Sequence, residues 1–73
     1  MRRIRFRVDE GHQLGVLDPD SPIHFHPDVH VQDGEEGHLI GPHGDVEGWF
    51  LAMYVRDGVE YQVPIQPLNM EPR

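Results

Sequence analysis

Basic and apolar side chains alternate strictly at the beginning of the chain. The basic positions are Arg3, Arg5 and Arg7, and the apolar positions between and after them are Ile4, Phe6 and Val8. A period of two is typical of a strand with one buried face, so the pattern predicts a strand over 3–8. A turn at 9–11 leads to a second predicted strand over 12–17, in which Gly15 indicates a bulge.

Proline and glycine divide the middle of the chain into short apolar pieces. Residues 18–22 are predicted to be a loop, because neither of their prolines can donate to a strand ladder. Short strands are expected at 23–26, where Pro27 ends the piece, and then at 29–32 and 38–40. Turns rich in glycine separate them, and no segment has the length or the pattern of a helix.

The longest apolar run covers residues 49–55 and is followed by Arg56-Asp57-Gly58 and an alternating run at 59–63. Its aromatic content and the turn after it favour a strand hairpin over a buried helix. With a two-residue turn at Asp57-Gly58, Tyr54 would lie opposite Tyr61. With a three-residue loop over 56–58, Val55 would lie opposite Val59 and Met53 opposite Tyr61.

The three-residue loop is the favoured prediction, because it joins Leu51, Met53 and Val55 to the apolar face of the following strand. Trp49 is expected in the core. Phe50 and Tyr54 then lie on the second face, where another element or a partner must cover them. This makes Phe50 and Tyr54 the first candidate partner-binding residues.

The prolines of residues 64–68 end the hairpin, and a 3₁₀ turn is expected over 66–69. Residues 70–73 are expected to form a last edge strand or to fray. The whole pattern predicts an all-β fold. We expect one domain over residues 1–73, a small, strongly bent antiparallel barrel of five or six strands with a short 3₁₀ turn near the C-terminus.

Residues 29–71 resemble the Src-homology-3-like barrels of the KOW and Tudor type. The resemblance rests on a glycine-rich turn ending in valine (Gly41 to Val46), a long strand, the 56–58 turn, a strand ending in Pro64, and Leu68. It implies a closing 3₁₀ turn with a packed leucine, and binding of a peptide, a nucleic acid or a larger enzyme as the function. Members that bind nucleic acids have basic loops, whereas the loops here are acidic.

The 73 residues carry a formal net charge of -7, and four of the six basic residues lie within the first seven positions. Residues 8–55 contain no Arg or Lys, so direct nucleic-acid binding is disfavoured, and a mimic of a polyanion is one alternative function. The absence of cysteine excludes disulfides and thiolate metal sites. No apolar run predicts a membrane span, and no secretory signal is recognisable, so a cytoplasmic location is expected.

Six histidines offer a second chemistry: His12, His24, His26, His30, His38 and His43. On a strand His24 and His26 point to the same side, and His30 follows after a turn. With His38 or His43 as a fourth ligand, these three form a candidate site for zinc or another divalent transition metal. The competing interpretation is that they are ordinary surface histidines without a cofactor.

An enzyme is not expected, because the chain has one serine, no threonine, cysteine or lysine, and no recognisable pair of nucleophile and base. The leading hypothesis is a non-enzymatic binding or accessory domain that recognises a protein partner or another copy of itself, as a homo-oligomer or a subunit of a larger complex. Arg3, Arg5 and Arg7 are candidate anchors for an acidic partner, or they simply pair with acidic neighbours across the sheet. The alternatives are the histidine-bound metal protein and an acidic inhibitor.

Overall fold

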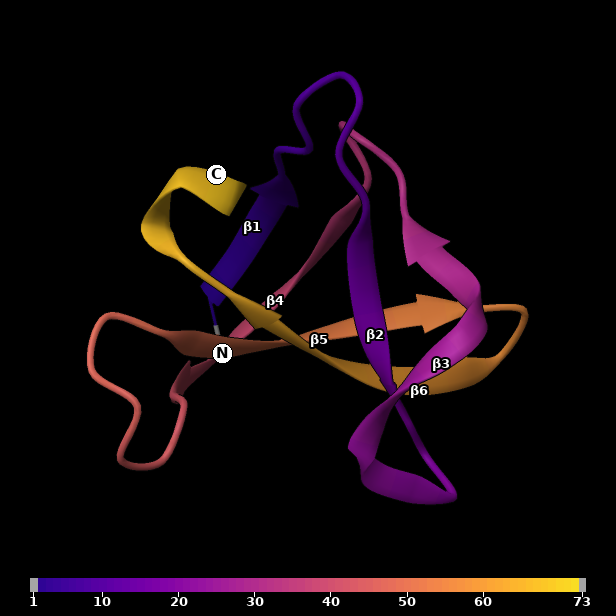
Figure 1. The fold of residues 1–73 in the computed structure, drawn as a ribbon. Coiled ribbons are helices and arrows are strands. Elements are labelled where there is room, and N and C mark those ends of the chain that lie inside the picture. The colour runs from indigo at the N-terminus through magenta and orange to yellow at the C-terminus, as the bar shows by residue number, and fades with distance from the viewer. Residues whose placement is uncertain (1, 73) are drawn as a thin grey trace.

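Seven strands and one 3₁₀ turn make up the part of the chain that the structure, a computed structural model, describes, residues 2–72 (Figure 1). They are β1 (Arg2–Phe6), β2 (Leu14–Asp18), β3 (Ser21–Val31), β4 (Glu36–Pro42), β5 (Phe50–Arg56), β6 (Val59–Ile65), the 3₁₀ turn η1 (Pro67–Asn69) and β7 (Met70–Pro72). The predicted all-β class and the terminal 3₁₀ turn are confirmed. No helix in this range is long and apolar enough to cross a membrane.

The strands form two antiparallel sheets. The larger has the order β6-β5-β4-β1-β7, and the smaller is the hairpin of β2 and β3, which the chain inserts between β1 and β4. The hairpin lies beside β6, while the 43–49 loop extends on the other side of the molecule (Figure 1). Strand pairing within the described residues does not close a barrel, so the expected barrel of five or six strands stays a prediction.

Apolar side chains from both sheets meet in one core. It consists of Ile4, Phe6, Leu14, Val16, Val31, Ala52, Tyr54, Val63 and Ile65. The alternation predicted for β1 is confirmed, because Ile4 and Phe6 are fully buried while Arg3 lies exposed on the opposite face. Phe6 meets Tyr54 edge to face, with ring centroids 6.0 Å apart, an arrangement that stabilises aromatic pairs.

Gly37 of β4 leaves the space that the Phe6 ring occupies. A Cβ atom at this position would lie 2.6 Å from Cε2 of Phe6 and would also collide with the backbone carbonyl oxygen of Met53. Both neighbours belong to packed parts of the fold, so neither can move away cheaply. The fold therefore requires glycine here for steric reasons.

The hairpin of β5 and β6 has the register that the sequence analysis did not favour. Arg56 pairs with Val59 and Tyr54 with Tyr61, across a two-residue turn in which Asp57 has φ 52° and Gly58 has φ 79°. Two successive positive φ angles are typical of a type I′ turn, which matches the twist of the two strands. The three-residue loop is therefore wrong, and the face that carries Leu51, Met53 and Val55 points away from the core.

β3 is one strand of 11 residues rather than two short pieces interrupted at Pro27. It contains Pro22 and Pro27, which it tolerates because β3 lies at the edge of its sheet and pairs with β2 alone. The irregularity expected at Gly15 is confirmed, since the pairing jumps from Gly15–His30 to Leu17–Phe25. The predicted 18–22 loop is a tight turn, in which the Asp18 carboxylate accepts the backbone N–H of Asp20 at 2.9 Å.

Candidate protein-binding groove

A groove of about 480 Å³ lies between the β2–β3 hairpin, the beginning of β5 and the 3₁₀ turn η1. Its apolar lining comes from Val8, Leu14, Phe25, Trp49, Pro64 and Leu68. Asp9, His12, Gln13, Gln66 and Asn69 contribute polar groups along it. Apolar and aromatic walls with a few polar groups are the usual composition of a ligand-binding cleft.

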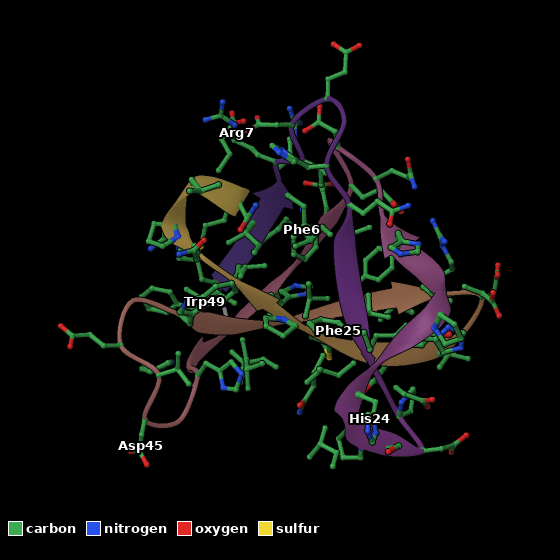
Figure 2. The ribbon with its side chains drawn as sticks, in the orientation of Figure 1. Phe6, Arg7, His24, Phe25, Asp45 and Trp49 are labelled. Carbon is green, nitrogen blue, oxygen red and sulfur yellow. The ribbon has the colours of Figure 1, made fainter. Side chains whose placement is uncertain are left out.

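Phe25 lies in this groove because Gly15 has no side chain. A Cβ atom on Gly15 would lie 2.9 Å from Cδ1 of Phe25, so the ring rests directly against the backbone of β2 (Figure 2). Even in this position Phe25 remains 61% exposed. Large aromatic side chains that stay this exposed in a small domain are candidates for contact with a partner.

Leu68 projects from η1 and is 62% exposed. The turn that carries it is fixed by Asn69, whose Oδ1 accepts the backbone N–H of Gln66 at 3.1 Å and whose Nδ2 donates to the Arg7 carbonyl at 3.3 Å. The backbone N–H of Arg7 also donates to the Asn69 carbonyl at 2.7 Å. The packed leucine that the resemblance implied at this position is therefore wrong, because the turn is held by hydrogen bonds and leaves Leu68 outside.

Trp49 lies immediately before β5 and is half-buried, rather than a core residue as expected (Figure 2). Backbone hydrogen bonds hold it at the end of the 43–49 loop. Its N–H donates to the Val46 carbonyl at 3.2 Å, and its carbonyl accepts the N–H of His43 at 3.0 Å. Trp49 thus forms a fixed aromatic wall of the groove.

The charge of the groove is acidic. Among the described residues that line it, Asp9 is the only charged one, and neither Arg nor Lys is present. Residues 8–55, which supply most of the lining, contain no Arg or Lys. The local field therefore favours a cationic ligand.

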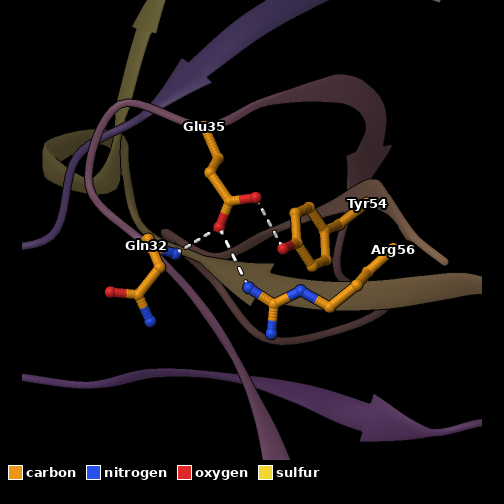
Figure 3. Close-up of polar contacts among 4 residues, drawn as sticks. All are labelled: Gln32, Glu35, Tyr54 and Arg56. Carbon is orange, nitrogen blue, oxygen red and sulfur yellow. Dashed lines mark hydrogen bonds and ion pairs between the residues drawn. The ribbon is translucent and has the colours of Figure 1, made fainter.

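A polar cluster around Glu35 ties the end of the β3–β4 turn to β5 (Figure 3). The Glu35 carboxylate accepts the hydroxyl of Tyr54 and the backbone N–H of Gln32, each at 2.7 Å, and lies 3.5 Å from Nη2 of Arg56. The Arg56 guanidinium also lies over the Tyr54 ring, 5.6 Å from its centroid. These contacts satisfy the one polar atom that Tyr54 brings into the core.

Burial raises the pKa of Tyr54 to about 12 from 10.0, and the Glu35 carboxylate adds to the rise while Arg56 opposes it. The folded state therefore favours the neutral phenol of Tyr54. Its contribution to the free energy of unfolding is fully present below about pH 10, where the phenol is protonated in the folded and in the unfolded chain. Between about pH 10 and 12 the unfolded chain ionises first, so the free energy of unfolding should fall by about 2–3 kcal/mol.

The ionisation of the Tyr54 phenol can be measured separately from other groups, because the chain has only two tyrosines and no lysine. In Tyr61→Phe, the tyrosinate absorbance reports Tyr54 alone, and its midpoint should lie at about 12 in the folded protein and about 10 in denaturant. Tyr54→Phe serves as the control without this signal. A midpoint near 10 in the folded protein would contradict the burial of the phenol beside Glu35.

Phe50 and Tyr54, the aromatic pair expected to contact a partner, do not line this groove. Tyr54 is 1% exposed and packs inside this chain, so a partner cannot reach its ring. Phe50 is half-buried against the core. This expectation depended on the three-residue loop, which put Phe50 and Tyr54 on the outer face of β5. In the observed register that face packs inward.

The histidines are not brought together. His24 lies at the tip of the β2–β3 hairpin, with Nδ1 2.8 Å from the Ser21 hydroxyl oxygen (Figure 2). Nδ1 of His26 accepts the backbone N–H of Asp28 at 3.1 Å, and its ring meets Tyr61 edge to face. His30 lies beyond the irregular part of β3, opposite Gly15.

Nowhere in residues 2–72 do three His, Cys, Asp or Glu side chains form a group that could hold a metal ion. The predicted site of His24, His26 and His30 is therefore not formed in this structure, because β3 continues through Pro27 and Asp28, where a turn before His30 was expected. Arg3 and Arg5 lie on the predicted face of β1, and Arg7 follows the end of this strand. Arg5 lies between Glu36 of β4 and Glu71 of β7 in the register of the sheet.

No protein-family model matches this chain, and no curated protein or solved structure matches it significantly. The assignment of the groove therefore rests on its own geometry. Sequence reasoning missed Phe25 and misplaced Trp49 and Leu68. The aromatic ring of Phe25 among polar residues was the one local signal that could have indicated an exposed binding side chain.

Proposed function

We propose that this chain is a non-enzymatic binding module that recognises an extended, apolar and basic segment of a protein partner in the groove between the β2–β3 hairpin and η1. One observation carries the proposal. Phe25 and Leu68, both more than half exposed, line the same groove as Trp49. Exposed apolar groups that gather in one depression mark interaction sites, whereas single exposed ones are ordinary.

The chemistry of the groove suggests the ligand. Aromatic-lined grooves accept extended segments, in particular proline-rich ones, which are already ordered before they bind and so lose little entropy. The net charge of -7 and the carboxylate of Asp9 at the groove favour Arg or Lys beside the apolar residues of the ligand. The same charges disfavour a nucleic acid.

The topology supports the resemblance to Src-homology-3-like barrels and, with it, a binding role. Five antiparallel strands in the order β6-β5-β4-β1-β7, with a 3₁₀ turn before the last strand, agree with the closing strand and turn that the resemblance implies. In this proposal the β2–β3 hairpin is a long insertion after the first strand, and it closes the barrel beside β6. It also supplies one wall of the groove.

A displayed library of random peptides, selected on the immobilised domain at neutral pH, tests the proposed function. Enriched peptides should combine apolar residues, proline among them, with Arg or Lys, and Phe25→Ser should weaken their binding at least about tenfold. Ile23→Ser is the matched control, because Ile23 lies two residues away on β3 and is 86% exposed but does not line the groove. Failure to enrich any peptide, or equal binding to Phe25→Ser and the wild type, would contradict the proposal.

A further inference from the structure

The chain contains two Asp-Gly sequences, and both lie in exposed turns. Asp33 and Gly34 belong to the turn between β3 and β4, and Asp57 and Gly58 connect β5 to β6. An Asp-Gly peptide can rearrange without an enzyme, because glycine has no side chain to keep its backbone nitrogen away from the aspartate carboxyl group. The two sites are alike in sequence and in exposure, so a difference in their reactivity must come from hydrogen bonds and backbone conformation.

Hydrogen bonds hold both residues of the first site. The Asp33 carboxylate accepts the backbone N–H of Val8 at 2.9 Å, and the N–H of Gly34 donates to the Phe6 carbonyl at 2.9 Å. The carboxyl group and the nitrogen that would have to meet are therefore each bound to a different residue at the end of β1. A reaction between them at Asp33 requires both hydrogen bonds to break first.

The second site has no such protection. Within residues 2–72 neither the Asp57 carboxylate nor the N–H of Gly58 takes part in a hydrogen bond, and the strand pairing ends one residue before and one residue after them. Asp57, with φ 52°, is also the only non-glycine residue of this range with a positive φ. A residue with a Cβ atom is less stable in that conformation than glycine, so rotation of the Asp57–Gly58 peptide out of the turn costs less.

We propose that Asp57 is a site of spontaneous isoaspartate formation, whereas Asp33 is protected by the fold. The backbone nitrogen of Gly58 attacks Cγ of the protonated Asp57 carboxyl group, and the carboxyl hydroxyl leaves with the amide proton as water. Water then adds to one of the two carbonyl carbons of the cyclic succinimide. Breaking the bond from nitrogen to Cγ restores aspartate. Breaking the bond from nitrogen to the backbone carbonyl carbon gives isoaspartate, in which the chain runs through Cβ and Cγ.

Isoaspartate lengthens the backbone of a turn that has only two residues. The type I′ geometry matches the twist of β5 and β6, and a longer backbone loses this match. The first strand pair that the change reaches is Arg56–Val59, and Arg56 is also the partner of Glu35 in the cluster around Tyr54. None of these residues lines the groove of Phe25, so the inference does not depend on the proposed function.

Peptide mapping of the wild-type protein after several weeks at physiological temperature tests the inference. A protease that cleaves before aspartate but not before isoaspartate distinguishes the two products at each site, and mass spectrometry measures the uncleaved peptides. In the folded protein isoaspartate should form at Asp57 at least about ten times faster than at Asp33, because the reaction at Asp33 must first break two hydrogen bonds. In denaturant the two rates should become equal, since glycine follows aspartate at both sites.

Asp57→Asn and Asp33→Asn are a matched pair of variants, because asparagine closes the same ring with release of ammonia in place of water. Asn-Gly suits a type I′ turn, and an amide oxygen at position 33 can still accept the N–H of Val8, so both variants keep the fold. Circular dichroism checks this, and Asp57→Asn should lose ammonia at least about ten times faster than Asp33→Asn. Equal rates at the two positions in the folded protein would overturn the proposal. So would a folded protein in which Asp57 stays unmodified while the denatured chain isomerises there.

Discussion

Replacing Gly37 with alanine is expected to destabilise the fold by about 3 kcal/mol or more. The added carbon would lie 2.6 Å from the Phe6 ring and would collide with the carbonyl of Met53. Phe6 is fully buried and packs against Tyr54, so its ring has no free space to enter. For a domain of this size, whose stability is marginal, such a loss removes a large part of the free energy of unfolding.

Urea unfolding followed by circular dichroism measures the effect. Gly15→Ala is the matched control, because its Cβ would meet only the ring of Phe25, which is exposed and can turn away. It should cost less than about 1 kcal/mol of stability, while it displaces Phe25 from its place in the groove. Equal losses for Gly37→Ala and Gly15→Ala would show that the packing of Phe6 under β4 is not as described.

Replacing Glu35 with alanine is expected to cost about 2–3 kcal/mol. The substitution removes the acceptor of the Tyr54 hydroxyl and of the Gln32 N–H, together with the partner of Arg56. The loss is larger than that of a surface ion pair, because Tyr54 is almost completely buried and its hydroxyl would lose its partner in the described fold. Glu10→Ala, in the exposed 9–11 turn, is the control and should stay within about 0.5 kcal/mol of the wild type.

A double-mutant cycle with Tyr54→Phe separates the hydrogen bond from the other contacts of Glu35. If the buried hydroxyl accounts for most of the effect, Glu35→Ala should cost about 1 kcal/mol less in the Tyr54→Phe background than in the wild type. Chemical denaturation of the four proteins supplies the numbers. A strictly additive cycle would contradict a direct contact between the two side chains.

Local pattern predicted β1 correctly, because its period of two depends on neighbouring residues alone. The face of β5 was misjudged, since the three-residue loop was favoured for joining Leu51, Met53 and Val55 to the apolar face of the following strand. A strand that is apolar on both faces does not reveal which face is buried. Here the preference of Asp57-Gly58 for a two-residue turn was the better guide, and it places Tyr54 inside.

The groove was beyond prediction from local pattern for a different reason. Phe25, Trp49 and Leu68 come from three distant segments, and only the packing of the hairpin beside β6 brings them to one depression. Proline also misled the prediction of β3, because its effect depends on whether a strand lies at the edge of a sheet. The histidine site is not formed for a related reason, because β3 continues through Pro27 and Asp28, where a turn was expected.

The groove is tested most directly by the fluorescence of Trp49, which is the only tryptophan of the chain and forms one wall of the groove. Titration with a basic, proline-containing peptide from the selection should change the Trp49 emission saturably in the wild type and in Ile23→Ser. The same titration of Phe25→Ser should require at least about ten times more peptide. A peptide that binds without changing the Trp49 emission, or that binds Phe25→Ser as tightly as the wild type, would contradict the assignment of this groove as the binding site.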